Sequence, residues 1–451
     1  MQVDGRERKL GWFVVPLPSG GPTHGWSLVV TGSAPDESDA TAWSTTSTGG
    51  QPSQTDWATI LALLSRVHPA ATLPETSQLI CDAVRETTDL DGAMIILMPE
   101  NSDFVHVSNS GPELPGFSTG STFPLENVAP IMEITARGPW YLDLSDPGTR
   151  SLIDSDLVDT LLGAGLTATA YGGLRSANAL LGVLAVASTA PGGPQILASR
   201  LPLIEQMARL AGAVLGTQAE RFLEFESRHQ TVRQVIEGRA LRTAFQPVVQ
   251  LPEGQLVGYE ALTRFADGTA PDVMIGEAHS LGLGVELEQA CVEIALNSAA
   301  QLPAELFLSV NLSPEAVVAG GVLPNLPQCD RTIVVEITEH AHINSYPDVR
   351  RALGCQPRFK VAVDDAGAGF ASLRHILELA PDYVKLDLGL VRNVDSDPAR
   401  AALVAGMCHF ASATGTQLIA EGVETAAEAQ TLCDLGVRLA QGYLFGRPGP
   451  L

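Results

Sequence analysis

Cations, paired cysteines and long apolar runs are all scarce in this sequence. Its 451 residues include 27 Lys and Arg against 51 Asp and Glu, a formal net charge of -24. That charge repels phosphate backbones and anionic lipid headgroups, which argues against a nucleic acid polymer or a membrane as the main partner. No run approaches the ~18 apolar residues of a spanning helix. The apolar stretch from Trp12 to Leu17 is interrupted by Pro16 and is too short for a secretory signal. We expect a soluble, cytoplasmic protein that binds an anionic substrate through local cations.

The cysteines occur singly, without the paired spacing of zinc sites or redox motifs. There are six of them: Cys81, Cys291, Cys329, Cys355, Cys408 and Cys433. Most have apolar neighbours, so we expect buried free thiols in a reducing compartment. Hydrophobic residues at 45% and charged residues at 17% are ordinary globular values, so the chain can fold without disulfides or structural metals.

The length and the composition along the chain predict two globular domains with connecting segments. Residues 1–54 are rich in Gly, Ser, Thr and Pro and poor in large apolar residues, which predicts a flexible tail. We place an α+β domain over residues 55–200, a helical linker over 201–238 and an α/β domain over 239–451.

The first domain shows a helix, a strand and a later strand pair. Apolar residues at helical spacing from Leu79 to Val84 precede an apolar run, Ala93–Met98, which is typical of a helix leading into a strand. The runs Leu166–Tyr171 and Leu180–Ala187 flank a glycine-containing stretch and predict a hairpin. This order of elements resembles a GAF domain. The resemblance implies a sensor domain with a small-molecule ligand that the sequence does not identify.

A heptad repeat occupies the predicted linker and predicts a long helix. Its seam positions are Ile204, Ala208, Ala211, Leu215, Gln218, Phe222, Phe225, His229, Val232 and Ile236. A seam exposed to solvent would be unstable, which favours a homodimer in which two copies of the helix pair. The alternative is that the seam packs on the domains of its own chain.

In the last domain, short β-type runs alternate with helical ones, as in a parallel sheet or barrel. The runs are Val257–Phe265, Leu306–Asn311, Ile333–Ile337, Lys360–Asp364, Tyr383–Leu386, Gln417–Ala420 and Arg438–Ala440. Nearly all carry polar residues close to their ends: Glu260, Asn311, Glu336, Asp364 with Asp365, Lys385, Glu421 and Gln441. In a barrel these ends converge on one mouth.

So many carboxylates in one mouth repel each other strongly unless cations lie among them. Oxygen ligands without His or Cys favour hard divalent ions, Mg²⁺ or Mn²⁺. Two such ions held a few ångströms apart are a known solution for phosphodiester hydrolysis. The sequence therefore predicts a metal-dependent site.

A series of motifs over the same residues resembles the EAL family of cyclic di-GMP phosphodiesterases. The motifs are Phe245-Gln246-Pro247, Glu260-Ala261-Leu262 followed by Arg264, Ser309-Val310-Asn311-Leu312-Ser313, Glu336-Ile337-Thr338-Glu339, Val363-Asp364-Asp365, Lys385-Leu386-Asp387, Ala420-Glu421-Gly422-Val423-Glu424 and Gln441-Gly442-Tyr443. The resemblance implies a TIM-like (β/α)8 barrel that hydrolyses cyclic di-GMP to linear pGpG with two Mg²⁺ or Mn²⁺ ions.

The resemblance also implies a role for each motif residue. The metal ligands would be Glu260, Asn311, Glu336, Asp364, Asp365 and Glu421, with Asp364 bridging the two ions. Lys385 would contact the attacking water as base or electrostatic anchor, so that Lys385, Glu421 and Glu260 are the catalytic set. Substrate would be bound by Arg264, Leu262, Gln246 and Gln441. Glu339 and Glu424 would support loops.

One loop departs from the family. After Asp365 the family usually continues Phe-Gly-Thr-Gly-Tyr-Ser-Ser, whereas residues 366–372 read Ala-Gly-Ala-Gly-Phe-Ala-Ser. The lost hydroxyls and aromatic ring remove hydrogen bonds that would order this loop. Two other functions therefore stay open: a receptor that binds cyclic di-GMP without cutting it, and a protein-interaction scaffold.

Overall fold

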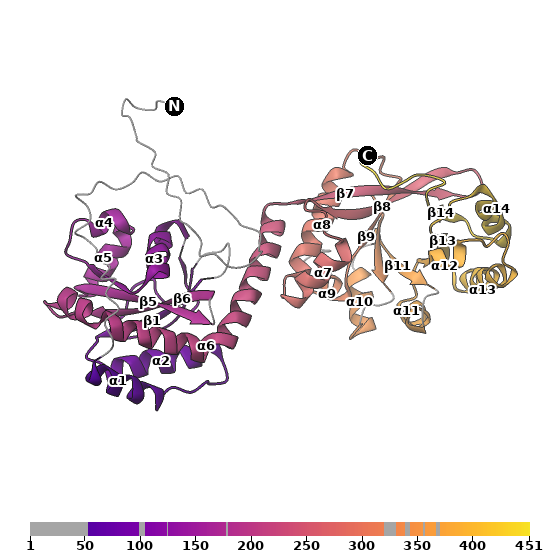
Figure 1. The fold of residues 1–451 in the computed structure, drawn as a ribbon. Coiled ribbons are helices and arrows are strands. Elements are labelled where there is room, and N and C mark those ends of the chain that lie inside the picture. Colours follow the sequence, from indigo (N-terminus) through magenta and orange to yellow (C-terminus); the bar gives the residue numbers. More distant parts are fainter. Residues whose placement is uncertain are drawn as a thin grey trace, which may run out of the picture. The chain divides into compact units, whose positions relative to one another are not determined.

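The structure, a computed structural model, describes residues 53–98, 104–123, 125–176, 179–319, 331–338, 343–354, 357–366 and 370–451 (Figure 1). The chain divides into two compact units, Met1–Ser227 and Arg228–Leu451. The predicted tail, residues 1–54, lies outside the described residues except for its last two positions. None of the described helices is long and apolar enough to cross a membrane.

The first unit is built on a six-stranded antiparallel sheet with strand order β3-β2-β1-β6-β5-β4. The strands are β1 Gly92–Leu97, β2 Phe104–Ser110, β3 Thr122–Phe123, β4 Trp140–Asp143, β5 Ala168–Ser176 and β6 Ala179–Ser188. The predicted first strand and the predicted hairpin, β5 with β6, are confirmed. The alternation of Val105, His106 and Val107 indicates the strand β2, whereas β3 and β4 were not predicted.

The glycines expected in the hairpin turn lie within β5 instead. A Cβ on Gly172 would meet the Cβ of Ala208 at 2.8 Å and the carbonyl oxygen of Ile204 at 3.1 Å. Both residues belong to the long helix α6, Gly193–Glu237. Gly172 therefore lets this helix approach the sheet closely.

The other helices of the first unit are α1 Gln54–Leu64, α2 Leu73–Thr87, α3 Leu125–Arg137, α4 Thr149–Leu152 and α5 Ser155–Gly163. Alternate residues of β1 point to opposite faces of the sheet. Ile95 packs in a core with Ile80 of α2 and Ile204 of α6, whereas Ile96 packs with Ile131 of α3 on the other side. The sheet thus has two covered faces.

The α6 helix contributes residues to a hydrophobic core of each unit. Most positions of the predicted dimer seam are therefore buried within the chain itself. Its seam residues Ile204, Ala208, Ala211 and Leu215 are buried in the core of the first unit. Val232 is buried in a core of the second unit. For these positions the dimer contact is wrong, and the alternative packing on the chain's own domains holds. Between them, Phe222 is half-buried and Phe225 is 43% exposed.

The second unit contains a closed barrel of eight strands in the order β10-β11-β12-β13-β14-β7-β8-β9. The strands are β7 Leu241–Gln250, β8 Gln255–Phe265, β9 Phe307–Asn311, β10 Ile333–Thr338, β11 Phe359–Ala366, β12 Tyr383–Leu386, β13 Gln417–Ala420 and β14 Leu439–Gln441. The predicted barrel is confirmed, but a uniformly parallel (β/α)8 arrangement is wrong. β7 runs antiparallel to both of its neighbours, β8 and β14.

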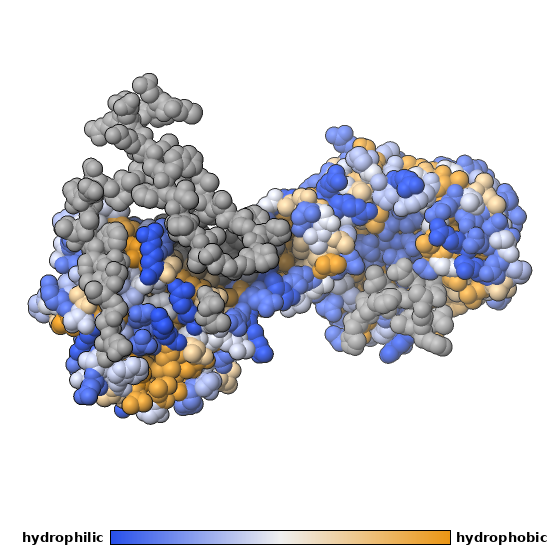
Figure 2. Space-filling view, viewed as in Figure 1, coloured by the Kyte–Doolittle hydropathy of each residue, from blue (hydrophilic) through white to orange (hydrophobic). Residues whose placement is uncertain are grey.

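Helices follow most of the parallel strands and surround them: α7 Pro271–Ser280, α8 Gly284–Ser298, α9 Pro314–Val318, α10 Tyr346–Leu353, α11 Phe370–Leu379, α12 Leu388–Val391, α13 Pro398–Thr414 and α14 Ala426–Leu435. The main core lies between strands and helices, and Leu308, Val363 and Val384 are among its fully buried strand residues. On the face seen in Figure 2, the described surface of the second unit is mostly hydrophilic.

Candidate active site

Strand periodicity puts two layers of side chains inside the barrel. The lower layer is mainly apolar: Val248, Phe307, Val334, Ala362, Ile419 and Leu439 form one cluster, with Tyr383 packed against it. Side chains two residues apart on a strand share a face. Two positions away from these residues stand Gln246, Ser309, Glu336, Asp364, Glu421, Gln441 and Lys385. The polar residues therefore form a second layer above the apolar one.

A glycine completes the lower layer on β8, two positions before Glu260. A Cβ on Gly258 would lie 2.6 Å from atoms of the Phe307 ring. That ring fills the space in which a side chain of β8 would otherwise stand. Glu260 thus takes the polar-layer position in the middle of β8, and not the strand end that the sequence suggested.

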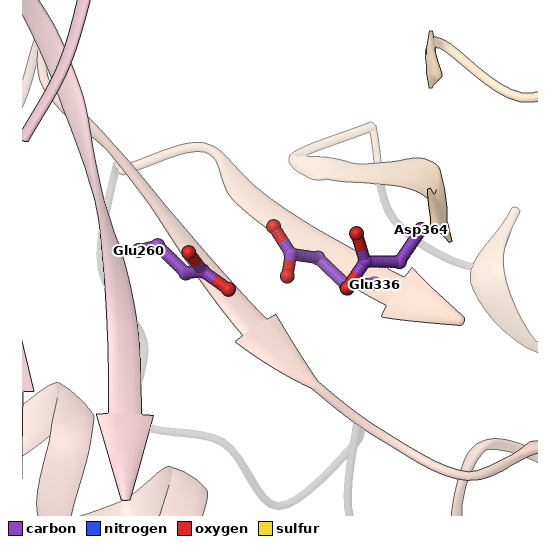
Figure 3. A group of neighbouring side chains, drawn as sticks. All are labelled: Glu260, Glu336 and Asp364. Atoms are coloured by element: carbon purple, nitrogen blue, oxygen red, sulfur yellow. The ribbon is translucent and has the colours of Figure 1, made fainter. Parts of the chain in front are cut away.

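Three carboxylates meet in the polar layer. One oxygen from each of Glu260, Glu336 and Asp364 lies within 4.8 Å of the others. Figure 3 shows the three carboxylates turned toward one another, Glu260 from β8, Glu336 from β10 and Asp364 from β11. Glu260 and Glu336 are 5% and 1% exposed, so water screens their charges poorly.

The Lys385 ammonium lies at the centre of this group. Its Nζ is 3.2 Å from Glu260 Oε1, 2.9 Å from Glu336 Oε2, 3.1 Å from Asp364 Oδ1 and 2.7 Å from Glu421 Oε1. The side chain is 1% exposed. One cation therefore faces four carboxylates, and negative charge remains in excess if all four ionise.

Two neutral side chains orient the acids. Gln441 Nε2 donates to Glu260 Oε2 at 2.8 Å and to Glu421 Oε1 at 3.0 Å, while its buried Oε1 has no partner among the described residues. The Ser309 hydroxyl donates to Glu336. The motif comparison assigns Ser309 no role, although its place two residues after the inward Phe307 indicates this contact.

The surroundings shift the pKa values of the buried acids in different directions. Burial and the neighbouring Glu260 charge raise the pKa of Glu336 well above its ordinary value. Burial also raises the pKa of Glu421, to about 8. Burial opposes ionisation of Glu260 too, but the Lys385 charge prevails and lowers its pKa. For Lys385, burial favours the neutral amine, yet the four carboxylates outweigh it and raise the pKa.

A cleft of ≈ 720 Å³ is lined by residues of β8, α7, α8 and the segment after β9, and Ala261, which follows Glu260, is among them. Leu262, Arg264 and Asn311 are among the lining residues. Asn311 pairs with Glu336 across β9 and β10, so the cleft adjoins the cluster. Arg264 is half-buried and donates to the Thr263 carbonyl at 2.8 Å, and it brings a positive charge to the cleft.

A buried acid that the sequence did not single out supports one wall of the cleft. Glu288 of α8 is 3% exposed. Its Oε2 accepts from the Ser313 backbone N–H at 2.7 Å, and its Oε1 lies 2.5 Å from His279 Nε2. Ser313 follows Asn311 by two residues, so Glu288 holds the segment that positions Asn311. A Glu on the buried face of a helix, beside Leu287, is the signal that could have found it.

The family comparison agrees with this geometry. The model of the EAL domain matches residues 229–448. These residues are an EAL domain. The match does not extend to the first unit.

Several curated proteins are similar to about half of this chain. An uncharacterized protein of Azorhizobium caulinodans is 32% identical over 267 residues, 52% of this chain and 35% of that protein. Cyclic di-GMP phosphodiesterase PdeL of Escherichia coli is 26% identical over 257 residues, 52% of this chain and 71% of PdeL. The chain spans only 35–38% of the length of the curated relatives with 32% identity.

A solved structure of Klebsiella pneumoniae BlrP1 with calcium and cyclic di-GMP is 28% identical. The alignment covers 54% of this chain and 66% of that one, with a TM-score of 0.42.

The remaining predicted residues of the EAL domain are less central or not described. Gln246 is 9% exposed and donates to the Gly446 carbonyl at 3.4 Å, a weak contact near the layer. Glu424 is exposed and accepts from Arg392 at 3.0 Å. Glu339 lies outside the described residues, as do residues 367–369 of the divergent loop and the side chain of Asp365.

The chemistry of the donor set fits hard divalent ions. Oxygens from Glu260, Glu336 and Asp364 lie close enough to share one ion, and no His or Cys is among them. The free, buried Oε1 of Gln441 offers a further acceptor for a metal-bound water. All-oxygen sets of this kind suit Mg²⁺, Mn²⁺ or Ca²⁺.

Proposed function

We propose that the EAL domain hydrolyses cyclic di-GMP to linear pGpG. The observation that carries the proposal is the polar layer: converging carboxylates around Lys385 beside a cleft large enough for a dinucleotide, in a domain whose relatives include PdeL, named a cyclic di-GMP phosphodiesterase. In the reaction a water oxygen bonds to phosphorus and the P–O3′ bond breaks. One proton of the water ends on the leaving 3′ oxygen.

Two ions, Mg²⁺ or Mn²⁺, complete the proposed site. Glu260, Asn311, Glu336 and Asp364 would hold the first, and Asp364 with Asp365 and Glu421 the second. Bound there, such ions lower the pKa of a bound water and stabilise charge on the phosphoryl oxygens. Asn311 and Asp365 enter this set from the family resemblance and not from a contact in the cluster.

We assign Lys385 the role of an electrostatic anchor. The carboxylates around it raise its pKa, so Nζ keeps its protons near neutral pH and is a poor base. It can donate hydrogen bonds to an attacking water or a phosphoryl oxygen while it compensates the acids. Gln441 fixes Glu260 and Glu421 through its amide.

Arg264 is the cation expected to hold a substrate phosphate. A chain with net charge -24 repels an anionic dinucleotide at long range, so a positive charge inside the cleft is needed to bind it. Leu262 lines the same cleft and offers an apolar surface for a base.

The test uses the purified full chain with cyclic di-GMP and Mn²⁺ or Mg²⁺, and separates pGpG by chromatography. We expect turnover that chelator abolishes. Glu336→Gln keeps the shape but removes a ligand charge, and should lower the rate roughly a hundredfold or more. Asp382→Asn is the matched control. Asp382 pairs with Lys360 at 2.8 Å just before β12, at the opposite end of the strand from Lys385, so its loss should leave the rate nearly unchanged.

The same experiment separates hydrolysis from plain binding. Tight binding of cyclic di-GMP with no pGpG in either metal would replace this proposal with the receptor function. Hydrolysis that persists in Glu336→Gln, or in chelator, would show that the carboxylate layer is not the catalytic site.

We further infer that the first unit is a GAF-like sensor that regulates the EAL domain. Supporting this is its order of elements: a helix, a strand pair, a varied middle, a closing antiparallel pair and a long helix. Residues of α6 belong to a core of each unit, so this helix connects the two units along the chain. A homodimer through the middle of α6, around Phe222 and Phe225, would couple two copies, and light scattering tests it.

A further inference from the structure

A cavity of ≈ 90 Å³ lies against the face of the first unit's sheet that α3 and α5 cover. The strands β1, β2, β5 and β6 form its floor, and Ile131 of α3, Leu161 of α5 and Phe117 belong to its cover. This face lies opposite to the one on which α2 and α6 pack.

Small residues in the middle of the sheet create the space. On β6, Ala185 and Ala187 face the cavity, whereas Leu184 and Val186 fill the opposite core. Gly92 of β1 lies next to Ala187, since its Cβ would be 3.4 Å from the Ala187 Cβ. Ala185 and Ala187 are only half-buried, so solvent reaches the floor of the cavity.

The described lining is apolar apart from a few neutral groups, and none of the lining residues that the structure describes is charged. Tyr171 and Thr169 contribute hydroxyls, and Thr169 Oγ1 donates to the Tyr171 hydroxyl at 3.1 Å. In this arrangement the Tyr171 hydroxyl keeps its own hydrogen to donate. Trp140 stacks on Tyr171 at 4.8 Å between ring centroids and donates to Thr135 at 2.8 Å, which fixes the tyrosine.

The volume sets the size of an occupant. Engineered apolar cavities of about 150 Å³ stay dry and bind benzene, and a single water needs only about 10–15 Å³ of such space. A cavity of ≈ 90 Å³ is therefore closer to one aromatic ring than to a nucleotide or a haem. A charged ligand would lose its hydration without a partner charge in the lining.

We propose that this cavity binds a neutral single-ring molecule with one hydrogen-bond acceptor, held by apolar contact and by the Tyr171 hydroxyl. The proposal names the ligand class of the sensor unit and so deepens its proposed role. It does not depend on hydrolysis of cyclic di-GMP, because ligand binding is measured directly.

The test is calorimetric titration of the full chain with phenol, benzene and benzoate. Phenol and benzene should each saturate one site per chain, and benzoate should bind at least about tenfold more weakly because its charge is uncompensated. Tyr171→Phe should weaken the affinity for phenol about three- to tenfold, the effect of one lost hydrogen bond. The affinity for benzene should stay unchanged. Ala185→Leu should fill the cavity and abolish the binding of both phenol and benzene.

Ala179→Leu is the matched control, since Ala179 lies on the same strand and is exposed. It should leave both affinities unaltered. Benzoate binding as tightly as phenol, or phenol binding unchanged in Ala185→Leu, would overturn the proposal. If Ala185→Leu does not fold, Tyr171→Phe decides: equal losses for phenol and benzene, or no loss for either, would also reject the site.

Discussion

Replacing Lys385 with Met should destabilise the second unit because it removes the cation from a buried group of acids. Lys385 contacts Glu260, Glu336, Asp364 and Glu421 at 2.7–3.2 Å and is 1% exposed. Breaking one partner of a buried ion pair costs about 3–5 kcal/mol. We expect a total loss of about 3–5 kcal/mol for all four contacts together, and not this loss for each contact.

The loss stays limited because the acids can take up protons. The pKa of Glu421 is already about 8, so this acid carries a proton near neutral pH, and burial raises the pKa of Glu336 well above its ordinary value. Without the ammonium, Glu260 would protonate as well. The destabilisation should therefore be smaller at about pH 5 than at about pH 8, where deprotonated acids repel each other.

Lys360→Met supplies the control for the loss of a lysine in general. Lys360 lies 2.8 Å from Asp382, but its side chain is 43% exposed, and such pairs contribute about 0–1 kcal/mol. Urea unfolding of both variants and the wild type, in chelator and with Mn²⁺, gives the comparison. Mn²⁺ should stabilise Lys385→Met more than the wild type because the ion replaces the lost positive charge.

The reasoning would be refuted if Lys385→Met lost no more stability than Lys360→Met in chelator. It would also fail if Mn²⁺ left the unfolding midpoint of Lys385→Met unchanged.

Three further predictions concern other parts of the chain. Because the pKa of Glu421 is raised to about 8, its carboxyl is protonated below that pH in the metal-free protein. Mn²⁺ must displace this proton, so metal affinity should rise up to about pH 8. Calorimetry in buffers of different ionisation enthalpy should detect the released proton, and Glu421→Gln should not release it. Leu215→Asp should unfold the first unit with a loss above about 3 kcal/mol, whereas Thr217→Asp, at an exposed position two residues further along the same helix, should change its free energy of unfolding by less than about 0.5 kcal/mol; chemical denaturation compares them. Glu288→Ala should lower metal affinity or activity about 10- to 100-fold through the Ser313 segment, which separate kcat and KM measurements would show.

Much of the barrel could be predicted because alternation of residue types reports which way a strand faces. The runs at residues 333–337, 383–386 and 417–420 agree with β10, β12 and β13 to within one residue. The strand β7 was missed because Pro247 lies in its middle, and a proline inside a run argues against a strand. Nothing local in the sequence states that β7 pairs antiparallel with β8 and β14.

The long helix shows where periodicity is insufficient. Apolar residues at helical spacing mark the face that is buried, but they do not name the partner that buries it. Leu215 satisfies the repeat equally well against a second copy or against β-strands of its own unit. Gly172, which admits α6 to the sheet, is the local sign of the second outcome, and it carries that meaning only once the two segments are known to meet.

The alternation of side chains along the strands makes the polar layer predictable. The same alternation forces acids together and so lowers the stability of the barrel. Each inward acid stands two residues from an apolar position that the lower layer requires, so folding the barrel brings Glu260, Glu336 and Asp364 together whether or not an ion is bound. Lys385 and protonation offset the repulsion only in part. The remaining excess of negative charge lowers the stability of the metal-free barrel. A divalent cation relieves this repulsion, so the same excess of charge favours its binding. Stability and metal affinity of this site are therefore coupled, and a substitution that relieves the repulsion in the metal-free protein should weaken its affinity for the metal.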